Sequence, residues 1–172
     1  MRPGQIFRQA MSYGVTRLRP RDADRFIRNI FQETSTVAKQ LFVNLPVRDL
    51  KKATAFYEAI GATKNPQFSD ETASCMVLSD TIFVMLLTHA KWEIFTKKPI
   101  VDSQRESEVM LALSAESRQA VDQTLDAAGA NGGKADVNAR QDHGFMYGRS
   151  FQDVDGHIWE SMYVDLSQFP KG

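Results

Sequence analysis

Regular hydrophobic patterning in the chain begins near residue 42. Alternating apolar positions over residues 42–47 predict a half-buried strand, because successive side chains of a strand point to opposite faces. Apolar positions at three- and four-residue spacing over residues 50–60 then predict a helix with one buried stripe. Asp49 has the short acceptor side chain that caps a helix N-terminus, and Gly61 is suited to end the helix.

The same succession of patterns returns 68 residues later, where residues 110–130 align without gaps with residues 42–62. Ser117 takes the place of the cap Asp49, and Gly129 takes the place of Gly61. Strand-like runs follow each helix, at 63–68, 74–78 and 81–87 in the first half and at 135–139, 145–151 and 157–163 in the second, with residues 153–156 as the last turn. Each half is therefore predicted to be a βαβββ module.

Neither half is large enough to bury its sheet and its helix alone, so the two are expected to share one structure. We predict an α+β fold in which two βαβββ modules form a curved mixed sheet around a cavity, with the helices on the outside. Module one takes about residues 39–88, a linker residues 89–103 and module two about residues 104–165, within one domain at 39–172. The cavity is the expected functional site.

Residues 1–38 lack this patterning apart from a short apolar piece near residues 26–31. They are interpreted as a basic, poorly ordered N-terminal extension. An organellar transit peptide and an upstream translation extension are the alternatives. Asp22, Asp24 and Glu33 count against a transit peptide, because such peptides avoid acidic residues.

Charge divides the chain in the same way. Residues 1–40 hold eight Lys or Arg and three acids, a net charge of +5, so the remainder carries −5 and the whole chain is formally neutral. An acidic body does not favour nucleic-acid binding. No apolar run approaches the roughly 18 residues of a membrane span, so a cytoplasmic protein without membrane contact is expected. Cys75, the only cysteine, lies in an apolar run and is expected to be buried.

Two segments of this repeat carry a family resemblance. Residues 41–57 (LFVNLPVRDLKKATAFY) and 151–160 (FQDVDGHIWE) resemble the two ends of a glyoxalase, bleomycin-resistance and extradiol-dioxygenase type domain, and the resemblance to this vicinal-oxygen-chelate superfamily covers about residues 39–165. Its enzymes hold a divalent metal with His, Glu or Gln side chains from equivalent strands. The resemblance puts the ligand positions at Phe42, Met85, Met110 and Glu160, and only Glu160 is a suitable metal ligand.

The resemblance therefore implies a degenerate metal site inside an apolar cup. Glu160 is its predicted polar anchor, a catalytic residue if the protein is an enzyme, with Arg149 as the expected partner of its carboxylate. His157 and Trp159 are expected on the opposite strand face. The alternative is that the cup side chains fill the core. The predicted ligand-binding residues are Phe42, Asn44, Met85, Met110, Tyr147, Arg149 and Met162.

The residues leave three functions open. The first is a homodimeric binding protein for a small organic molecule, without a cofactor. The alternative is a metal-dependent lyase, isomerase or dioxygenase that combines Glu160 with His143 or Glu108 and a divalent metal. Lactoylglutathione lyase activity is disfavoured by the replaced ligand positions. The second alternative is a dimeric interaction protein with an apolar contact patch of Trp92, Phe95 and Trp159.

Overall fold

A computed structural model describes residues 39–107 and 109–168. The predicted N-terminal extension at residues 1–38 and the candidate ligand Glu108 lie outside the described residues, as do residues 169–172.

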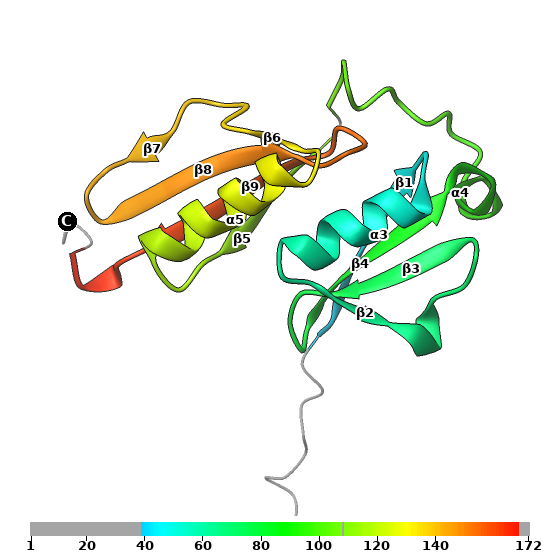
Figure 1. Ribbon diagram of the computed structural model, residues 1–172, viewed down its shortest axis with the longest axis horizontal. Helices are drawn as coiled ribbons and strands as arrows, with labels where there is room; N and C mark the ends of the chain where they lie inside the picture. The colour runs from blue at the N-terminus through cyan, green and yellow to red at the C-terminus, as the bar shows by residue number, and fades with distance from the viewer. Residues whose placement is uncertain (1–38, 108, 169–172) are drawn as a thin grey trace, which may run out of the picture. The chain divides into compact units, whose positions relative to one another are not determined.

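Module one is a four-stranded sheet covered on one face by a helix (Figure 1). Along the chain its elements are β1 (Leu41–Val47), α3 (Leu50–Ala59), β2 (Thr63–Asn65), the 3-10 turn η2 (Pro66–Phe68), β3 (Ala73–Val77) and β4 (Ile82–Thr88). The strand order is β1-β4-β3-β2. Strand β1 runs parallel to β4, and the other pairs are antiparallel.

Module two repeats this plan after the helix α4 (His89–Phe95). Its elements are β5 (Met110–Ser114), α5 (Arg118–Ala130), β6 (Lys134–Ala135), β7 (Gln141–Asp142), β8 (Met146–Gln152), β9 (Ile158–Val164) and the 3-10 turn η3 (Leu166–Gln168). The order is β5-β9-β8-β6, with β7 paired to β8, and β5 runs parallel to β9. The α+β class and the two βαβββ modules are therefore confirmed.

Both helix caps are where the repeat predicts them. The Asp49 side chain accepts hydrogen bonds from the amides of Lys51 and Lys52, each at 3.1 Å, and Ser117 accepts one from Ala120 at 3.0 Å. Gly61 follows α3 with φ +103°, a conformation that favours glycine. The prediction for Gly129 is wrong, because α5 continues to Ala130 and Asn131 caps it.

Three other sequence predictions differ from the structure. Helix α4 occupies the start of the predicted linker, and its first turn is capped by the Thr88 side chain. The run at 63–68 is a three-residue strand followed by a 3-10 turn, in which Pro66 supplies no amide for strand pairing. In the run at 135–139 only Ala135 belongs to a strand, the short β6, and the next strand, β7, begins after the run at Gln141.

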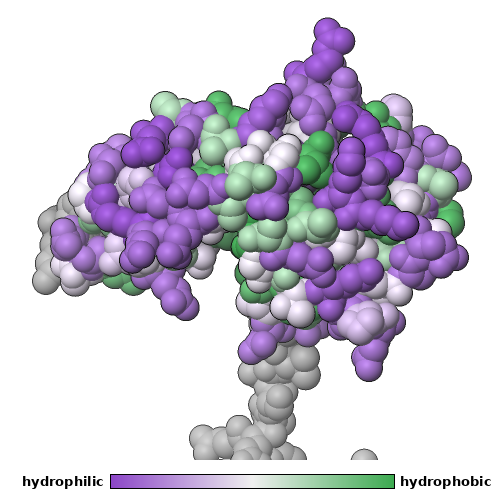
Figure 2. Space-filling model, viewed as in Figure 1, coloured by the Kyte–Doolittle hydropathy of each residue, from purple (hydrophilic) through white to green (hydrophobic). Residues whose placement is uncertain are grey.

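The two sheets are separate, and in Figure 1 each helix lies in front of its own sheet. One core nevertheless joins them, since buried side chains of α3 meet aromatic residues of module two. The rings of Phe56 and Phe151 lie 6.1 Å apart, and Tyr57 meets Trp159 edge-on, also at 6.1 Å. Figure 2 shows that the outer surface on this side is mostly hydrophilic. In the described part of the chain, no helix has the length and apolar character needed to cross a membrane.

A buried polar network accompanies this aromatic contact. The Tyr57 hydroxyl donates to Asp153 Oδ2 at 2.8 Å and accepts from Trp159 Nε1 at 3.0 Å. Burial, followed by the Asp153 carboxylate, holds the pKa of Tyr57 well above its ordinary value. Asp153 Oδ1 accepts hydrogen bonds from the amides of Asp155, Gly156 and His157. The network thus fixes the β8–β9 turn of module two against the helix of module one.

Gly133, just after α5, is the tightest packing point that can be tested by substitution. A Cβ there would come within 2.7 Å of Phe56 Cε2 and closer still to the Gln152 carbonyl oxygen. We expect Gly133→Ala to lower the free energy of unfolding by about 2 kcal/mol, the usual cost of overpacking. Urea denaturation followed by circular dichroism measures this change.

Gly129→Ala is the matched control. A Cβ at Gly129 would make only an ordinary 3.8 Å contact with Ala135, and alanine in a helix is favoured over glycine by roughly 1 kcal/mol. We therefore expect unchanged or higher stability. Equal stability of Gly133→Ala and the wild type would contradict the packing of Phe56 against this turn.

Candidate functional site

Each sheet has one face that its helix does not cover. In module one, Leu45 and Leu86 are buried toward α3, so strand alternation places Phe42, Asn44 and Met85 on the other face. In module two, Trp159 is buried toward the helix side, so the uncovered face carries Met110, Ala112, Ile158, Glu160 and Met162. The predicted separation of Glu160 from Trp159 is confirmed.

The strand register shows that Met85 and Glu160 occupy equivalent positions in the two modules. Met85 pairs with Asn44, and Glu160 pairs with Ala112, which is 68 residues after Asn44. The same offset relates Phe42 to Met110. About half of each of these last two side chains is exposed, 49% and 52% respectively. The four positions implied by the family resemblance are therefore two corresponding pairs on the two uncovered faces.

Glu160 is half-buried at a small hollow of about 10 Å³ on the module-two face. Gln141 of β7 lies at its edge, and Ser150 lies opposite Glu160 on β8. The buried Ser150 hydroxyl accepts a hydrogen bond from the Asn138 amide at 2.8 Å. Within residues 39–107 and 109–168, the Glu160 carboxylate has no hydrogen-bond or ion-pair partner. The full lining is Ala139, Gln141, Gly148, Arg149, Ser150, Glu160 and Met162.

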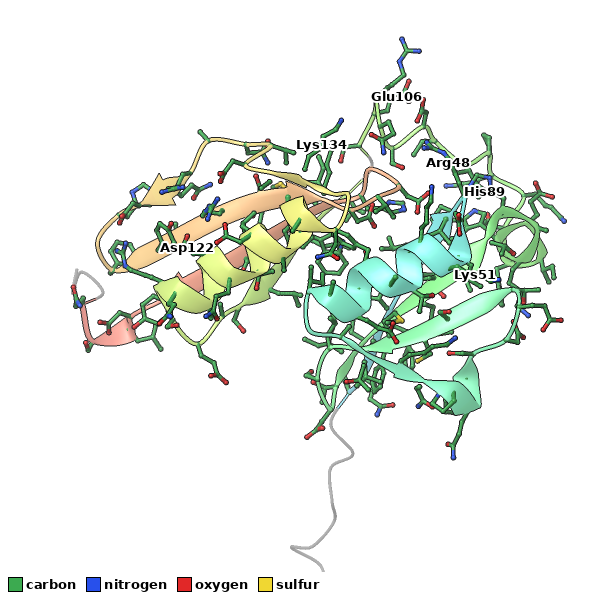
Figure 3. The ribbon with its side chains drawn as sticks, viewed as in Figure 1. Arg48, Lys51, His89, Glu106, Asp122 and Lys134 are labelled. Carbon is green, nitrogen blue, oxygen red and sulfur yellow. The ribbon has the colours of Figure 1, made fainter. Side chains whose placement is uncertain are left out.

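Tyr147 does not line the Glu160 hollow, and the expected pairing of the Arg149 guanidinium with Glu160 is wrong. Arg149 donates to Asp122 at 2.8 Å and to both oxygens of Asp136 at 2.9 and 2.7 Å, and its side chain is only 9% exposed. The Tyr147 hydroxyl donates to Asp122 at 2.7 Å. Figure 3 labels Asp122 on α5, so this cluster lies on the helix side of the sheet.

The hydrogen bonds and ion pairs of this cluster lower the pKa values of its carboxyl groups and raise the pKa of its guanidinium group. Hydrogen bonds from Tyr147 and then Arg149 lower the pKa of Asp122, and the bond from Arg149 lowers the pKa of Asp136. The same bonds, that to Asp136 first, raise the pKa of Arg149. The guanidinium is therefore fully engaged with carboxylates of its own side and is not free to neutralise Glu160.

Arg118 at the start of α5 holds the β7 segment in place. Its guanidinium donates to Asp142 Oδ2 at 2.8 Å, to Asp142 Oδ1 at 2.9 Å and to the Gly144 carbonyl at 2.7 Å. It also lies 4.9 Å from the centre of the Tyr147 ring. The bond from Arg118 lowers the pKa of Asp142 to about 2. Sequence reasoning missed this clamp, because nothing in the sequence links Arg118 to a residue 24 positions away.

The other candidate residues are dispersed. His143 does not line the Glu160 hollow, and its ring instead lies 6.5 Å from that of Phe145. His157 Nε2 is 2.9 Å from the Pro46 carbonyl oxygen, across the junction between the modules. Among the described residues, no group of three or more His, Cys, Asp or Glu side chains is arranged to hold a metal ion.

The proposed aromatic patch is also dispersed. Trp159 is buried in the core, so its assignment to an exposed contact patch is wrong, whereas Phe95 is 69% exposed. Cys75 is buried as predicted. A second hollow of about 90 Å³ lies beneath the linker and is lined in part by Trp92, Ile100 and Glu106. Sequence analysis did not predict it.

The fold has many counterparts among solved structures. They include a hypothetical protein from S. aureus, at 26% identity over 78% of this chain and 98% of that chain with a TM-score of 0.61. A glyoxalase/bleomycin resistance protein/dioxygenase family enzyme from Burkholderia phytofirmans PsJN has 17% identity over 74% and 99% of the two chains and a TM-score of 0.61. The fosfomycin resistance protein FosX from Mesorhizobium loti has 16% identity over 77% and 98%, with a TM-score of 0.55.

These comparisons confirm the resemblance inferred from the sequence. The chain has the fold of the vicinal-oxygen-chelate superfamily, to which the glyoxalase, bleomycin-resistance and dioxygenase proteins belong. No protein-family model and no curated protein matches the sequence.

Replacing Arg118 tests whether the β7 segment depends on this clamp. We expect amide hydrogen exchange over residues 141–144 to be about tenfold faster in Arg118→Ala, because loss of three hydrogen bonds favours local opening. Hydrogen-exchange mass spectrometry measures this effect.

Arg140→Ala is the control for this experiment. Its ion pair with Asp136 is long, at 4.0 Å, and its side chain is 54% exposed, so exchange over residues 141–144 should not change. Equal exchange in Arg118→Ala and the wild type would contradict the assigned role of Arg118.

Proposed function

We propose that this protein binds a small organic molecule and carries a degenerate form of its superfamily's metal site. The observation that supports this most strongly is the chemistry of the four corresponding positions. Phe42, Met85 and Met110 offer an aromatic ring and thioethers, which are poor ligands for Mg²⁺, Mn²⁺ or Zn²⁺. Glu160 alone keeps a side chain of the ligand type. A catalytic ion needs about three protein ligands, so these residues do not fit one.

The lining suits an organic ligand with an apolar, flat body. Phe42 stacks on Phe83 with ring centres 4.8 Å apart and planes inclined by 12°. Methionine side chains adapt their shape and make favourable contacts with ring edges. Met85, Met110 and Met162 therefore provide a lining that can adjust to an aromatic molecule, with Asn44 and Glu160 as its polar points.

A second copy of the chain is proposed to complete the site, in a cytoplasmic homodimer. Strands β1 and β5 are both edge strands of their sheets. Leu41 and Phe42 of β1, together with Val109 and Met110 at β5, are about half exposed. Exposed edges with apolar side chains are unusual in an isolated protein, because they favour association.

The second candidate function is a metal-dependent lyase, isomerase or dioxygenase. The observation that favours it is the retained carboxylate of Glu160, which has no partner in the described part of the chain. A partner chain would have to supply further ligands. A dimer whose only role is protein interaction is a third candidate, supported by the exposed Phe95.

Elemental analysis of the purified protein separates the first two candidates. After growth with Mg, Mn, Fe, Ni and Zn supplied, we expect no stoichiometric metal in the wild type. The variant Phe42→His/Met85→Glu/Met110→His restores ligand side chains and should bind about one divalent ion per site. Adding Glu160→Gln to this variant should remove that ion.

One equivalent of metal in the wild type, lost in Glu160→Gln, would contradict the degenerate site and support an enzyme. Failure of the restored variant to bind metal, while folded by circular dichroism, would show that the four positions do not converge.

Light scattering coupled to size exclusion tests the dimer. We expect the wild type to be dimeric at micromolar concentration and the variant Leu41→Asp/Val109→Asp to be monomeric, because each aspartate would be desolvated at the interface. Leu166→Asp is the control, since Leu166 is 79% exposed and lies outside the two edges. A monomeric wild type would refute the homodimer.

A further inference from the structure

We propose that this ligand site selects organic cations, in which a positively charged nitrogen is attached to an apolar, flat body. This inference rests on the proposed binding function and adds the charge of the ligand to it. It comes from the distribution of ionisable side chains over the two uncovered faces.

The uncovered face of module two has one acidic side chain, Glu160, and one basic side chain, Lys134 of β6, which lies opposite Gln152 and does not line the Glu160 hollow. Alternation and register place eleven residues of β5, β8 and β9 on this face. Glu160 is the only one of these eleven with an ionisable side chain. They are Met110, Ala112, Ser114, Met146, Gly148, Ser150, Gln152, Ile158, Glu160, Met162 and Val164.

The uncovered face of module one carries no charge to balance Glu160. Its residues on β1 and β4 are Phe42, Asn44, Pro46, Phe83, Met85 and Leu87. Those on β2 and β3 are neutral as well, and the buried Cys75 is the one among them with an ionisable group. The described strand residues of the two faces therefore hold one carboxylate and one base, Lys134 at the β6 edge of its sheet. In the lining of the Glu160 hollow, the one other charged residue is Arg149.

The nearest cation is committed elsewhere. Arg149 contributes to the lining of the Glu160 hollow, but its guanidinium is bound to Asp122 and Asp136. The Glu160 carboxylate lies in this hollow beside Met162 and has no hydrogen-bond or ion-pair partner among the described residues. A cationic ligand would supply that partner, and an anionic ligand would add repulsion in a region of reduced dielectric constant.

The rest of the lining suits an organic cation better than a metal ion. The other side-chain oxygen atoms around Glu160 that could coordinate a metal ion belong to the Gln141 amide and the Ser150 hydroxyl. That hydroxyl already accepts a hydrogen bond from the backbone amide of Asn138. Aromatic rings such as the Phe42–Phe83 pair attract an alkylammonium group, because the quadrupole of each ring makes its face electrostatically negative. Methionines accommodate the apolar body.

The test compares three probes that share one apolar body. Naphthylmethyl-trimethylammonium is the cation, naphthalenemethanol the neutral probe and naphthoate the anion, each titrated into the full chain by isothermal calorimetry. We expect the cation to bind about tenfold more tightly than the neutral probe, as one ion pair in a half-buried site provides, and the anion not to bind. Added KCl should weaken cation binding and leave neutral binding unchanged.

Glu160→Gln should abolish the preference for the cation and retain the affinity for the neutral probe. Glu58→Gln is the matched control, because it removes the same charge from an exposed position on α3 and should keep the preference. The salt dependence of the wild type gives an independent measurement if Glu160→Gln does not fold.

The possible results separate this inference from the proposed function. Equal binding of the cation and the neutral probe, or a preference that survives Glu160→Gln, would overturn the selectivity for cations and leave the binding function in place. Absence of binding by all three probes would overturn both.

Discussion

The arrangement of the two modules depends on one buried carboxylate. Asp153 is 2% exposed and receives four hydrogen bonds, three from backbone amides of its own turn and one from the Tyr57 hydroxyl. A buried charge is tolerated only when such donors surround it. The carboxylate therefore sets the shape of the β8–β9 turn and its attachment to α3. Asp155 adds a bond to the Arg48 amide at 2.9 Å.

The sequence predicted the fold well because its signals are local and occur twice. Helix stripes, the caps Asp49 and Ser117, and the 68-residue offset each depend on neighbouring residues. The errors at the helix ends lie at local signals that the sequence analysis did not use. Helix α4 needs the Thr88 cap, and α5 passes Gly129 because Gly132, at φ +91°, makes the turn.

For the candidate site, the sequence predicted the Glu160 face of β9 and failed on β8. A four-residue turn at 153–156 would pair Arg149 with Glu160. In the structure the His157 amide also bonds to Asp153, so residues 153–157 form the connection and Ser150 pairs with Glu160. A shift of one residue in register turns every side chain of a strand to the other face. Tyr147 and Arg149 thereby lie on the helix side.

The equivalence of Met85 and Glu160 has a consequence for how a ligand could lie. An ancestral duplication gives two identical halves, in which a molecule can bind in either of two reversed directions with equal energy. Here one half has a thioether and the other has a carboxylate at the same position. The different side chains at this pair make the two binding directions unequal in energy. Within one pair of faces, a bound molecule therefore has one preferred orientation.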